Sequence, residues 1–499
     1  MKHTLTANDL EQYLEKDAAT FTRDDIVRYM EENYIDLLNF RYVGEDGKLK
    51  TLNFAPSNRE HLEDILTFGE RVDGSSLFSY IDHASSDLYV IPKYRTAFVN
   101  PFTEKPTLDI LCSFFTPDGK PLESSPENVL RKAYEYFKKE TGYVFKTLAE
   151  LEYYIKSTIY DEQLYPDNDQ KGYHSSAPFT KFEYIRQEAM DLLVKCGGKI
   201  KYGHSEVGTF TTDEYLYEQH EIEFLAEEPE QAIEHLILAK WILRKLCDRD
   251  DLTISWAPKI TEGKAGSGLH FHMQLEKDGR NIMLKDGVLS DEAKKMIAGI
   301  LDTAGALTAF GNTVPTSYLR LVPGQEAPTY VCWGYRNRSA LVRVPLGWSN
   351  NIDMAKIVNP QAEDAKQGKV RQTIEFRVPD GSADAYLLLA GLITASVHGL
   401  KMDNALEFAE KTYAYTNIFS PEFKDKLAKL EELPANCYES GEVLLQKREI
   451  FEHSGAFPAK LLESVAKKLQ SYDDKGLSQR IHGNMDEIKK IVDKYMHCM

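Results

Sequence analysis

The sequence lacks the features that mark membrane proteins, secreted proteins and nucleic-acid-binding proteins. No apolar run in its 499 residues approaches the roughly 18 residues of a membrane-spanning helix, and the stretch from Leu387 to Val397 predicts a buried helix instead. The first residues contain no apolar signal-peptide core. The formal net charge of −18 argues against nucleic acid or an anionic membrane as a partner.

Cysteine is scarce, and its spacing matches neither a disulfide framework nor a metal-binding motif. The six cysteines lie far apart, at Cys112, Cys196, Cys247, Cys332, Cys437 and Cys498. Isolated thiols of this kind are typical of a reducing compartment, so we expect a cytoplasmic protein with free cysteines. The sequence also has no internal repeat and no low-complexity tract.

Polar side chains that can bind metal or anions recur at a spacing of two residues in three segments. The pairs are Glu150 with Glu152, His270 with His272, and Glu375 with Arg377. In an extended strand this spacing sends both side chains to one face, and the apolar neighbours indicate strands inside a packed domain. Buried carboxylates need a compensating cation to stay ionised. An oxygen-rich site of this kind suits Mg²⁺ or Mn²⁺, which commonly carry nucleotide phosphates.

A simpler interpretation applies to each pair taken alone. Alternating charged and apolar residues most often mean a strand with one face in water. The complete set favours two adjacent divalent-metal sites over that interpretation, because it combines the pairs with further acids; its members are Glu150, Glu152, Glu206, Glu221, His270 and Glu375.

Arginine is concentrated in one segment of this acidic chain. Between Tyr318 and Pro345 the sequence carries arginines at 320, 336, 338 and 343 against a single acid, Glu326. Guanidinium groups bind carboxylate and phosphate oxygens in a bidentate manner, so with Arg377 they predict a clamp for an anionic substrate and a polyphosphate. Surface salt bridges are the alternative for each arginine alone.

The turn-rich segment from Thr116 to Pro121 predicts a domain boundary, which divides the chain into residues 20–117 and 118–499. In the first part we expect a helix around residues 24–30 and strands at residues 35–43 and 88–99. In the second part Pro126 begins a helix that Gly142 ends. Helical patterns dominate from Met402 onward.

At this point the motifs match a known family. The sequence resembles type I glutamine synthetase over most of its length, and the motifs occur in the family's order. They are Asp73-Gly74-Ser75-Ser76, Glu150-Leu151-Glu152, His204-Ser205-Glu206-Val207, Gln219-His220-Glu221, Gly266-Ser267-Gly268-Leu269-His270-Phe271-His272, Arg320-Leu321-Val322-Pro323-Gly324, Arg336-Asn337-Arg338-Ser339-Ala340 and Glu375-Phe376-Arg377-Val378-Pro379-Asp380.

The resemblance implies a fold and an assembly. The expected fold is α+β, with an N-terminal β-grasp domain and a C-terminal catalytic domain whose curved antiparallel sheet, flanked by helices, holds the metals. The expected oligomer is a dodecamer of two stacked hexameric rings with active sites between subunits.

The resemblance also assigns roles to residues. The cation near the amino-acid substrate matches Glu152, Glu206 and Glu221, and the cation at the ATP phosphates matches Glu150, His270 and Glu375. Nucleotide contacts match His272 and Arg343. Substrate contacts match Gly266, Arg320, Arg338 and Arg377, of which the last two face the transferred phosphoryl group. Glu326 matches a flap residue that closes over the intermediate. The ammonium site matches Asp73 as base, with Ser76, Asp87 and Tyr173.

The implied reaction joins ammonium to the γ-carboxylate of glutamate at the expense of ATP. A carboxylate is a poor acyl donor, so it is first phosphorylated to γ-glutamyl phosphate, with metals and arginines neutralising charge. The amine then displaces phosphate, giving glutamine and ADP. A lid such as the Glu326 segment keeps water from the acyl phosphate.

Departures from the family pattern leave other functions open. Ala265 stands where the family usually has Asn, and Thr373 stands where it often has Arg, with Arg371 nearby. A γ-glutamyl-amine ligase for a polyamine or ethanolamine is therefore an alternative, and a catalytically silent relative is another. The tyrosine motif that is adenylylated in some members has no match, although Tyr413 and Tyr415 lie in that region.

Overall fold

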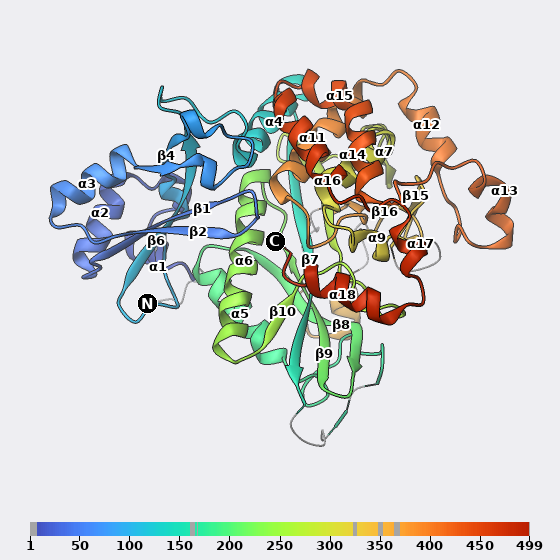
Figure 1. Ribbon diagram of the computed structural model, residues 1–499, viewed down its shortest axis with the longest axis horizontal. Coiled ribbons are helices and arrows are strands. Elements are labelled where there is room, and N and C mark those ends of the chain that lie inside the picture. The colour runs from blue at the N-terminus through green and yellow to red at the C-terminus, as the bar shows by residue number, and fades with distance from the viewer. Residues whose placement is uncertain are drawn as a thin grey trace.

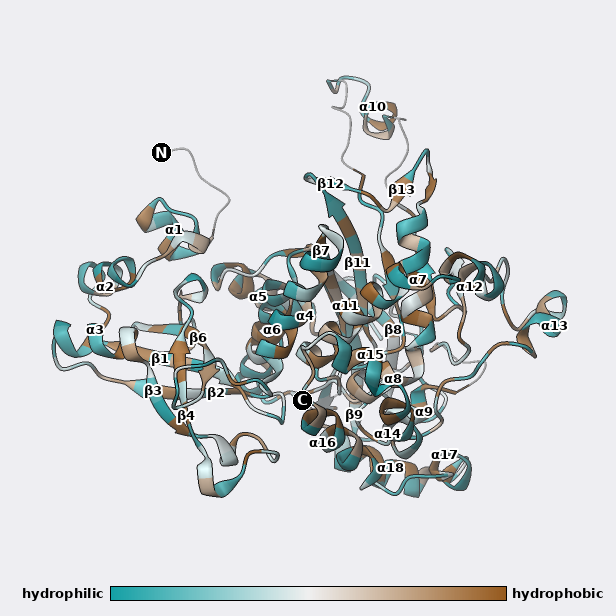
Figure 2. Ribbon diagram, turned by 90° about the horizontal axis from the view of Figure 1, so that it is seen from above, coloured by the Kyte–Doolittle hydropathy of each residue, from teal (hydrophilic) through white to brown (hydrophobic). Residues whose placement is uncertain are grey.

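The computed structural model describes residues 7–159, 165–166, 168–322, 327–347, 353–363 and 370–498. These residues form a smaller N-terminal sheet with its own helices and a larger sheet that most of the helices surround (Figure 1). The smaller sheet lies at one end of the long axis, and α12 and α13 lie at the other end in both views (Figures 1 and 2). The architecture is α+β, as the sequence predicts.

The smaller sheet has the strand order β2-β1-β6-β4-β3, with β5 also paired to β6. Strands β1 and β6 run parallel, and the remaining pairs run antiparallel. The N-terminal helices share its apolar core, to which Leu10, Ile26 and Ile65 belong. The elements are α1 Asp9–Leu14, α2 Arg23–Glu32, β1 Leu37–Val43, β2 Leu49–Phe54, α3 Arg59–Phe68, β3 Glu70–Asp73, β4 Asp87–Pro92, β5 Phe98–Val99 and β6 Thr107–Phe115.

One predicted strand of this part is wrong as a single element. The stretch from residue 88 to residue 99 is β4, a 3₁₀ turn at Tyr94–Thr96, and β5. The ladder ends at Pro92, which has no N–H to donate. The predicted helix around residues 24–30 is confirmed as α2, whose Thr22 and Asp25 form a capping box.

The larger sheet has the order β15-β16-β17-β11-β7-β9-β8 and is antiparallel except for the pair β15–β16. Two short strands extend it, because β10 pairs with β7 and β12 with β11. A separate hairpin joins β13 and β14. The strands are β7 Val144–Thr158, β8 Ile200–Thr211, β9 Tyr215–Phe224, β10 Thr253–Ser255, β11 Leu269–Lys277, β12 Arg280–Asn281, β13 Leu284–Lys285, β14 Val288–Leu289, β15 Trp333–Tyr335, β16 Val342–Val344 and β17 Ile374–Phe376.

The helices of the larger part begin with α4, which starts at Pro126 and stops before Gly142 in the left-handed conformation, as the sequence predicts. The full set is α4 Pro126–Thr141, α5 Glu183–Lys195, α6 Pro229–Arg249, α7 Asp291–Asp302, α8 Ala304–Gly311, α9 Ser317–Arg320, α10 Met354–Val358, α11 Ala385–Lys401, α12 Ala405–Thr412, α13 Lys424–Leu427, α14 Cys437–Gln446, α15 Arg448–His453, α16 Ala459–Gln470, α17 Leu477–Ile481 and α18 Met485–Tyr495.

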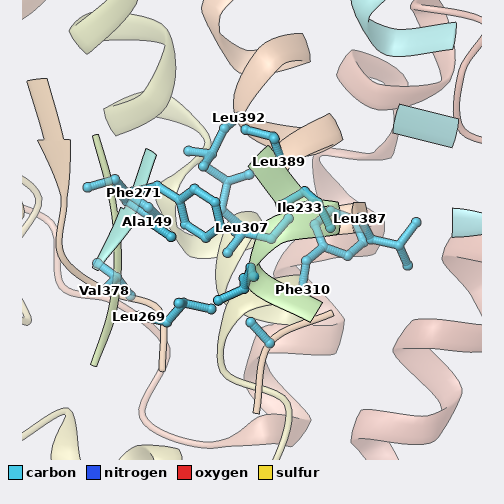
Figure 3. Packing of buried hydrophobic residues seen from close by; sticks show 14 of the residues in the cluster. Ala149, Ile233, Leu269, Phe271, Leu307, Phe310, Val378, Leu387, Leu389 and Leu392 are labelled. Atoms are coloured by element: carbon cyan, nitrogen blue, oxygen red, sulfur yellow. The ribbon is translucent and has the colours of Figure 1, made fainter. Parts of the chain in front are cut away.

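Alternate residues of the central strands pack against these helices. Ala149 of β7 and Phe271 of β11 lie with Leu307 of α8 and with Leu389 and Leu392 of α11 in one apolar cluster (Figure 3). Because strand side chains alternate between faces, the intervening Glu150, His270 and His272 point to the opposite face.

Charged side chains join the smaller part to α6 of the larger part. Arg95 donates from Nη1 to Oε2 of Glu234 at 2.7 Å, and Lys93 binds both Glu234 and Glu230. Lys93 and Glu234 are largely buried, so this cluster holds the small sheet against the large one in a fixed orientation. No single helix in the described ranges has the length and apolar character of a membrane span; only the bent pair α11–α12, with an angle of 112°, passes that test jointly.

Candidate active site

The register of the large sheet gathers the predicted acids and histidines on one face. Glu150 of β7 lies opposite His270 of β11, and Glu152 of β7 lies opposite Glu221 of β9. Glu221 in turn lies opposite His204 of β8. On the other side, His272 lies opposite Glu375 of β17, which lies opposite Arg343 of β16. One continuous face therefore carries side chains that the sequence separates by more than two hundred positions.

A first cluster forms around Glu150 and Glu375. His270 Nδ1 and His272 Nε2 each lie 2.9 Å from a carboxylate oxygen of Glu150. Glu375 accepts hydrogen bonds from Arg343 Nη1 at 2.8 Å and Arg377 Nε at 3.0 Å. Burial alone would raise the pKa of Glu150, but His272 and His270 hold that pKa well below its usual value.

A second cluster forms around Glu206 and Glu221. His204 Nε2 lies 3.1 Å from Glu221 Oε1, and Glu152 accepts a hydrogen bond from the Gly268 N–H at 2.6 Å. Burial and the Glu152 charge raise the pKa of Glu206 to about 8. Burial and the charges of Glu150 and Glu152 raise the pKa of Glu221 well above its usual value. These carboxylates thus oppose one another's ionisation.

The donor set fits divalent cations. Ligand atoms of Glu150, His272 and Glu375 lie within 4.8 Å of one another, as do those of His204, Glu206 and Glu221. A cation in the second cluster would relieve the repulsion that raises the pKa values of Glu206 and Glu221. His270 also lies 3.7 Å from Glu375, so the two histidines of β11 both face the first cluster.

The Gly266-Ser267-Gly268 segment lets Arg320 approach the sheet. A Cβ at Gly268 would lie 2.5 Å from His270 Nε2 and 2.7 Å from Arg320 Nη2. A Cβ at Gly266 would lie 2.5 Å from the Pro258 carbonyl oxygen. Arg320 is buried and donates from Nη1 to the Val378 carbonyl at 2.8 Å. Space therefore requires glycine at Gly266, and at Gly268 a Cβ would displace the His270 and Arg320 side chains.

The remaining arginines lie at the same edge of the sheet. Arg377 is buried and donates to the Arg338 carbonyl as well as to Glu375, whereas the Arg338 side chain is exposed. Arg338 is close enough to Glu206 to oppose the rise in its pKa. Thr373 Oγ lies 3.0 Å from His272 Nδ1 and so orients that ring. Glu326, the predicted flap residue, lies outside the described residues.

The predicted ammonium-site residues occupy two separate places in one chain. Asp73 and Asp87 face each other across β3 and β4, and the Ser76 hydroxyl donates to Asp73 at 2.6 Å. Serine hydroxyls, with Ser76 foremost, lower the pKa of Asp73. Tyr173 instead lies against His204, with ring centroids 5.4 Å apart. Both views place the β3–β4 hairpin far from β8 and β9 (Figures 1 and 2).

Sequence reasoning did not single out Glu223, which the structure places at the site. Glu223 of β9 lies opposite Glu150, is buried, and pairs through Oε1 with Lys201 Nζ at 2.6 Å. Its Oε2 has no hydrogen-bond partner among the described residues. The signal was available, since Glu223 stands two positions after Glu221 on the same strand face.

A buried network behind the acids was also missed. Arg186 of α5 donates from Nη1 to Ser205 Oγ at 3.2 Å and lies 2.6 Å from His220 Nδ1. Glu218 lies 3.5 Å from His220 Nε2 and accepts from the N–H groups of Lys181 and Phe182 at the start of α5. Ser205 and His220 alternate with His204 and Glu221, so the network lies behind the sheet face that carries the two clusters.

Comparison with known proteins agrees with this geometry. Residues 34–117 match the family described as glutamine synthetase, beta-Grasp domain, and residues 123–472 match glutamine synthetase, catalytic domain. Glutamine synthetase from Methanococcus maripaludis is 30% identical over 424 residues, covering 83% of this chain and 87% of the relative. That from Clostridium saccharobutylicum is 30% identical over 430 residues, covering 85% and 89%.

Solved structures share the fold at lower identity. A Plasmodium falciparum glutamine synthetase determined by cryoEM aligns with TM-score 0.73 and 20% identity, covering 92% of this chain and 97% of the other. A structure described as a GmaS/ADP complex aligns with TM-score 0.69 and 19% identity, covering 90% and 96%.

The fold and the matched domains define a ligase that joins a β-grasp domain to a curved catalytic sheet. The chain belongs to the glutamine synthetase family, as its motifs suggested.

Proposed function

We propose that this enzyme ligates ammonium to the γ-carboxylate of glutamate, with ATP as the phosphoryl donor and γ-glutamyl phosphate as the intermediate. The observation that carries the proposal is the pair of acid-and-histidine clusters on one face of the sheet, edged by Arg343, Arg377 and Arg338. The curated relatives named glutamine synthetase support it.

Each group has a task in this reaction. Glu150, His270 and Glu375, with His272, would hold Mg²⁺ or Mn²⁺ on the nucleotide side, and Glu152, Glu206 and Glu221, with His204, would hold one beside glutamate. Such cations neutralise phosphate charge and polarise the attacked oxygen.

The arginines bind the substrates' charged ends. Arg320 holds the α-carboxylate of glutamate beside the Gly266 backbone, and Arg343 together with His272 holds nucleotide phosphate. Arg338 and Arg377 stabilise the charge that develops on the transferred phosphoryl group. The Glu326 segment excludes water from the acyl phosphate.

The acceptor site is completed by a second subunit in this proposal. Asp73, Ser76 and Asp87 are exposed on the small sheet and lie away from Tyr173 in a single chain. A homo-oligomer, proposed as a dodecamer of two hexameric rings, would bring the Asp73 carboxylate of one copy to Tyr173 of the next. The lowered pKa keeps Asp73 ionised, so its carboxylate attracts ammonium by charge, and its role as base rests on the family match alone. We place the enzyme in the cytoplasm, in keeping with its six free cysteines.

One observation favours a γ-glutamyl-amine ligase as the second candidate. Ala265 is buried, its N–H donates to Gln170 at 2.7 Å, and its carbonyl accepts from the Tyr154 hydroxyl at 2.8 Å. No side-chain amide is therefore presented at this position. The rings of Tyr173, His174 and His204 contact one another near the second cluster and could border a larger amine.

Glutamate-dependent phosphate release from ATP with a panel of amines separates these functions. We expect ammonium to support the fastest release, ahead of putrescine and ethanolamine, with Glu375→Gln protein as the background control. Faster release with putrescine or ethanolamine than with saturating ammonium would make the protein a γ-glutamyl-amine ligase. Absence of glutamate-dependent release with every amine would mean a silent family member.

A further inference from the structure

A cavity of about 490 Å³ lies between α12 and α13, at the end of the molecule remote from the small sheet. Val331, Phe408 and Leu430 form an apolar lining, and Lys411, Lys426 and Lys429 add ammonium groups. This volume falls within the usual range for small-molecule sites, which combine apolar walls with a few charged groups. None of these residues belongs to the site described above.

The charged residues that line the cavity are positive on balance. Asp425 and Glu431 also line it, but no ion pair joins either acid to Lys411, Lys426 or Lys429 in the described part of the chain. Lys426 Nζ is fixed by the Tyr413 carbonyl at 2.6 Å. Three ammonium groups therefore outnumber the two acids in a protein whose net charge is −18. Lysine ammonium groups of this kind bind phosphate as point charges.

The walls of the cavity are hydrogen-bonded to the segment that carries Arg338. Trp333 Nε1 donates to the Ala409 carbonyl at 2.7 Å, and the Val331 N–H donates to the Glu431 carbonyl at 2.8 Å. Asn337 Nδ2 donates to the Thr416 carbonyl at 2.7 Å. A ligand that contacts both α12 and α13 would thus reduce the mobility of the backbone segment that carries Arg338.

We propose that this cavity is a second ligand site, for a small phosphorylated molecule with an apolar or aromatic body. The phosphate would lie among Lys411, Lys426 and Lys429, and the body would lie against Phe408 and Leu430. Phosphate is favoured over carboxylate because a dianion gains more from several ammonium groups than a monoanion does. The binding part of this proposal does not rest on the proposed function.

Phenyl phosphate is a direct probe, with benzoate as the carboxylate arm and phenol as the uncharged arm. Calorimetric titration of the full-length protein should detect phenyl phosphate binding that weakens with salt. The double variant Lys411→Ala, Lys429→Ala should weaken it by about tenfold or more. Lys424→Ala is the matched control, because Lys424 is exposed on α13 and does not line the cavity.

Three results of the titrations would overturn the proposed site, and a fourth would overturn its preference for phosphate. Absence of phenyl phosphate binding, equal binding by the double variant, or equal loss in Lys424→Ala would exclude the cavity. Benzoate binding as tight as phenyl phosphate would overturn the phosphate assignment.

The coupling to Arg338 rests on the proposed function and has its own readout. Saturating phenyl phosphate should lower the KM for glutamate in the wild-type enzyme and leave it unchanged in the double variant. An unchanged KM in both would overturn the coupling, whereas failure of the proposed function would show as absence of glutamate-dependent turnover.

Discussion

At the scale of single residues, Glu206 has the most informative environment in the catalytic sheet. Its pKa rises to about 8 from an ordinary value of 4.5 because of burial and the Glu152 charge. The folded protein therefore keeps a proton on Glu206 that the unfolded chain releases near pH 4.5. Without metal, the ionisation of Glu206 therefore lowers the free energy of unfolding as pH rises from about 4.5 to about 8. Above about pH 8 it has no further effect.

We predict that thermal stability in EDTA falls between pH 5.5 and pH 8, and that saturating Mg²⁺ or Mn²⁺ restores it. Restoration should be larger at pH 8, because a cation binds the ionised carboxylates and competes with the proton. Melting curves by circular dichroism at both pH values, with and without metal, measure this effect.

In EDTA, the melting temperature of the Glu206→Gln protein should depend less on pH than that of the wild type. Added Mg²⁺ or Mn²⁺ should also raise it much less. Glu487→Gln is the control, because Glu487 is exposed on α18. This substitution should leave the pH dependence and the stabilisation by metal unchanged. A metal effect of equal size in Glu206→Gln would remove Glu206 from the ligand set.

Residue spacing predicted correctly, and for a physical reason, which side chains share one face of the sheet. The period of two in an extended strand places Glu150 with Glu152, and His270 with His272, on one face, and the observed register agrees. The position of Glu206 could not be derived in this way, because the register between β8 and β9 shifts between Ser205 and Thr209. A bulge re-aims side chains through local twist, which the sequence pattern does not encode.

At the scale of elements, the start of α5 connects the loop that carries Tyr173 to strand β9. Glu218 accepts hydrogen bonds from the Lys181 and Phe182 N–H groups and from the Thr180 hydroxyl. Burial would raise the pKa of Glu218, but His220 and these N–H groups lower it, so its charge stabilises the fold above its unfolded pKa. The loop that carries Tyr173 leads directly to the Lys181 and Phe182 N–H groups that Glu218 binds.

Glu218→Gln should therefore destabilise the protein by about 1–3 kcal/mol, the usual cost of disrupting a buried charged hydrogen-bond network. It should also raise the KM for ammonium more than the KM for ATP, because the Tyr173 loop loses its anchor. Chemical denaturation and steady-state kinetics measure the two effects.

Glu188→Gln provides the comparison on the same helix. Glu188 pairs with Arg249 on the exposed face of α5, so its loss should change stability by less than about 1 kcal/mol and leave both KM values unaltered. A parallel rise of both KM values in Glu218→Gln would indicate general disruption instead of a positioning role.

Elements with strong local signals were predicted, and those set by tertiary contacts were not. Pro126 and Gly142 marked both ends of α4, and the apolar stretch at Leu387 proved to be the buried α11. The break between β4 and β5 was missed because apolar alternation continues through it. Pairing of β7 with β11 and of β11 with β17 joins distant segments, and single-sequence patterns carry no such register.

At the scale of the whole molecule, one chain keeps its predicted catalytic residues in two separate places. Asp73 is exposed on the small sheet, and Glu152 lies on the large one. If neighbouring subunits complete each other, Asp73→Ala and Glu152→Ala proteins should each be inactive, while co-assembled mixtures should regain activity at interfaces that pair intact surfaces.

For random mixing at equal amounts, about a quarter of the interfaces should combine two intact surfaces, which sets the expected recovery. Differently tagged chains allow mixed oligomers to be purified and verified before assay. A mixture made with Glu152→Ala and Glu375→Ala is the control, because every chain then carries a lesion in its own large sheet and no interface should regain activity. No recovery in verified mixed oligomers would assign Asp73 and Glu152 to one subunit.

The spread of the first cluster along the chain has a consequence for biosynthesis. It joins Glu150 on β7 to Glu375 on β17, and β11 must lie between these strands before the cluster exists. A nascent chain on the ribosome therefore exposes Glu150 long before Glu375 is translated, whereas the second cluster lies on β8 and β9, which follow β7 directly. Long-range strand pairing is slow, so the first cluster acquires its geometry later than the second.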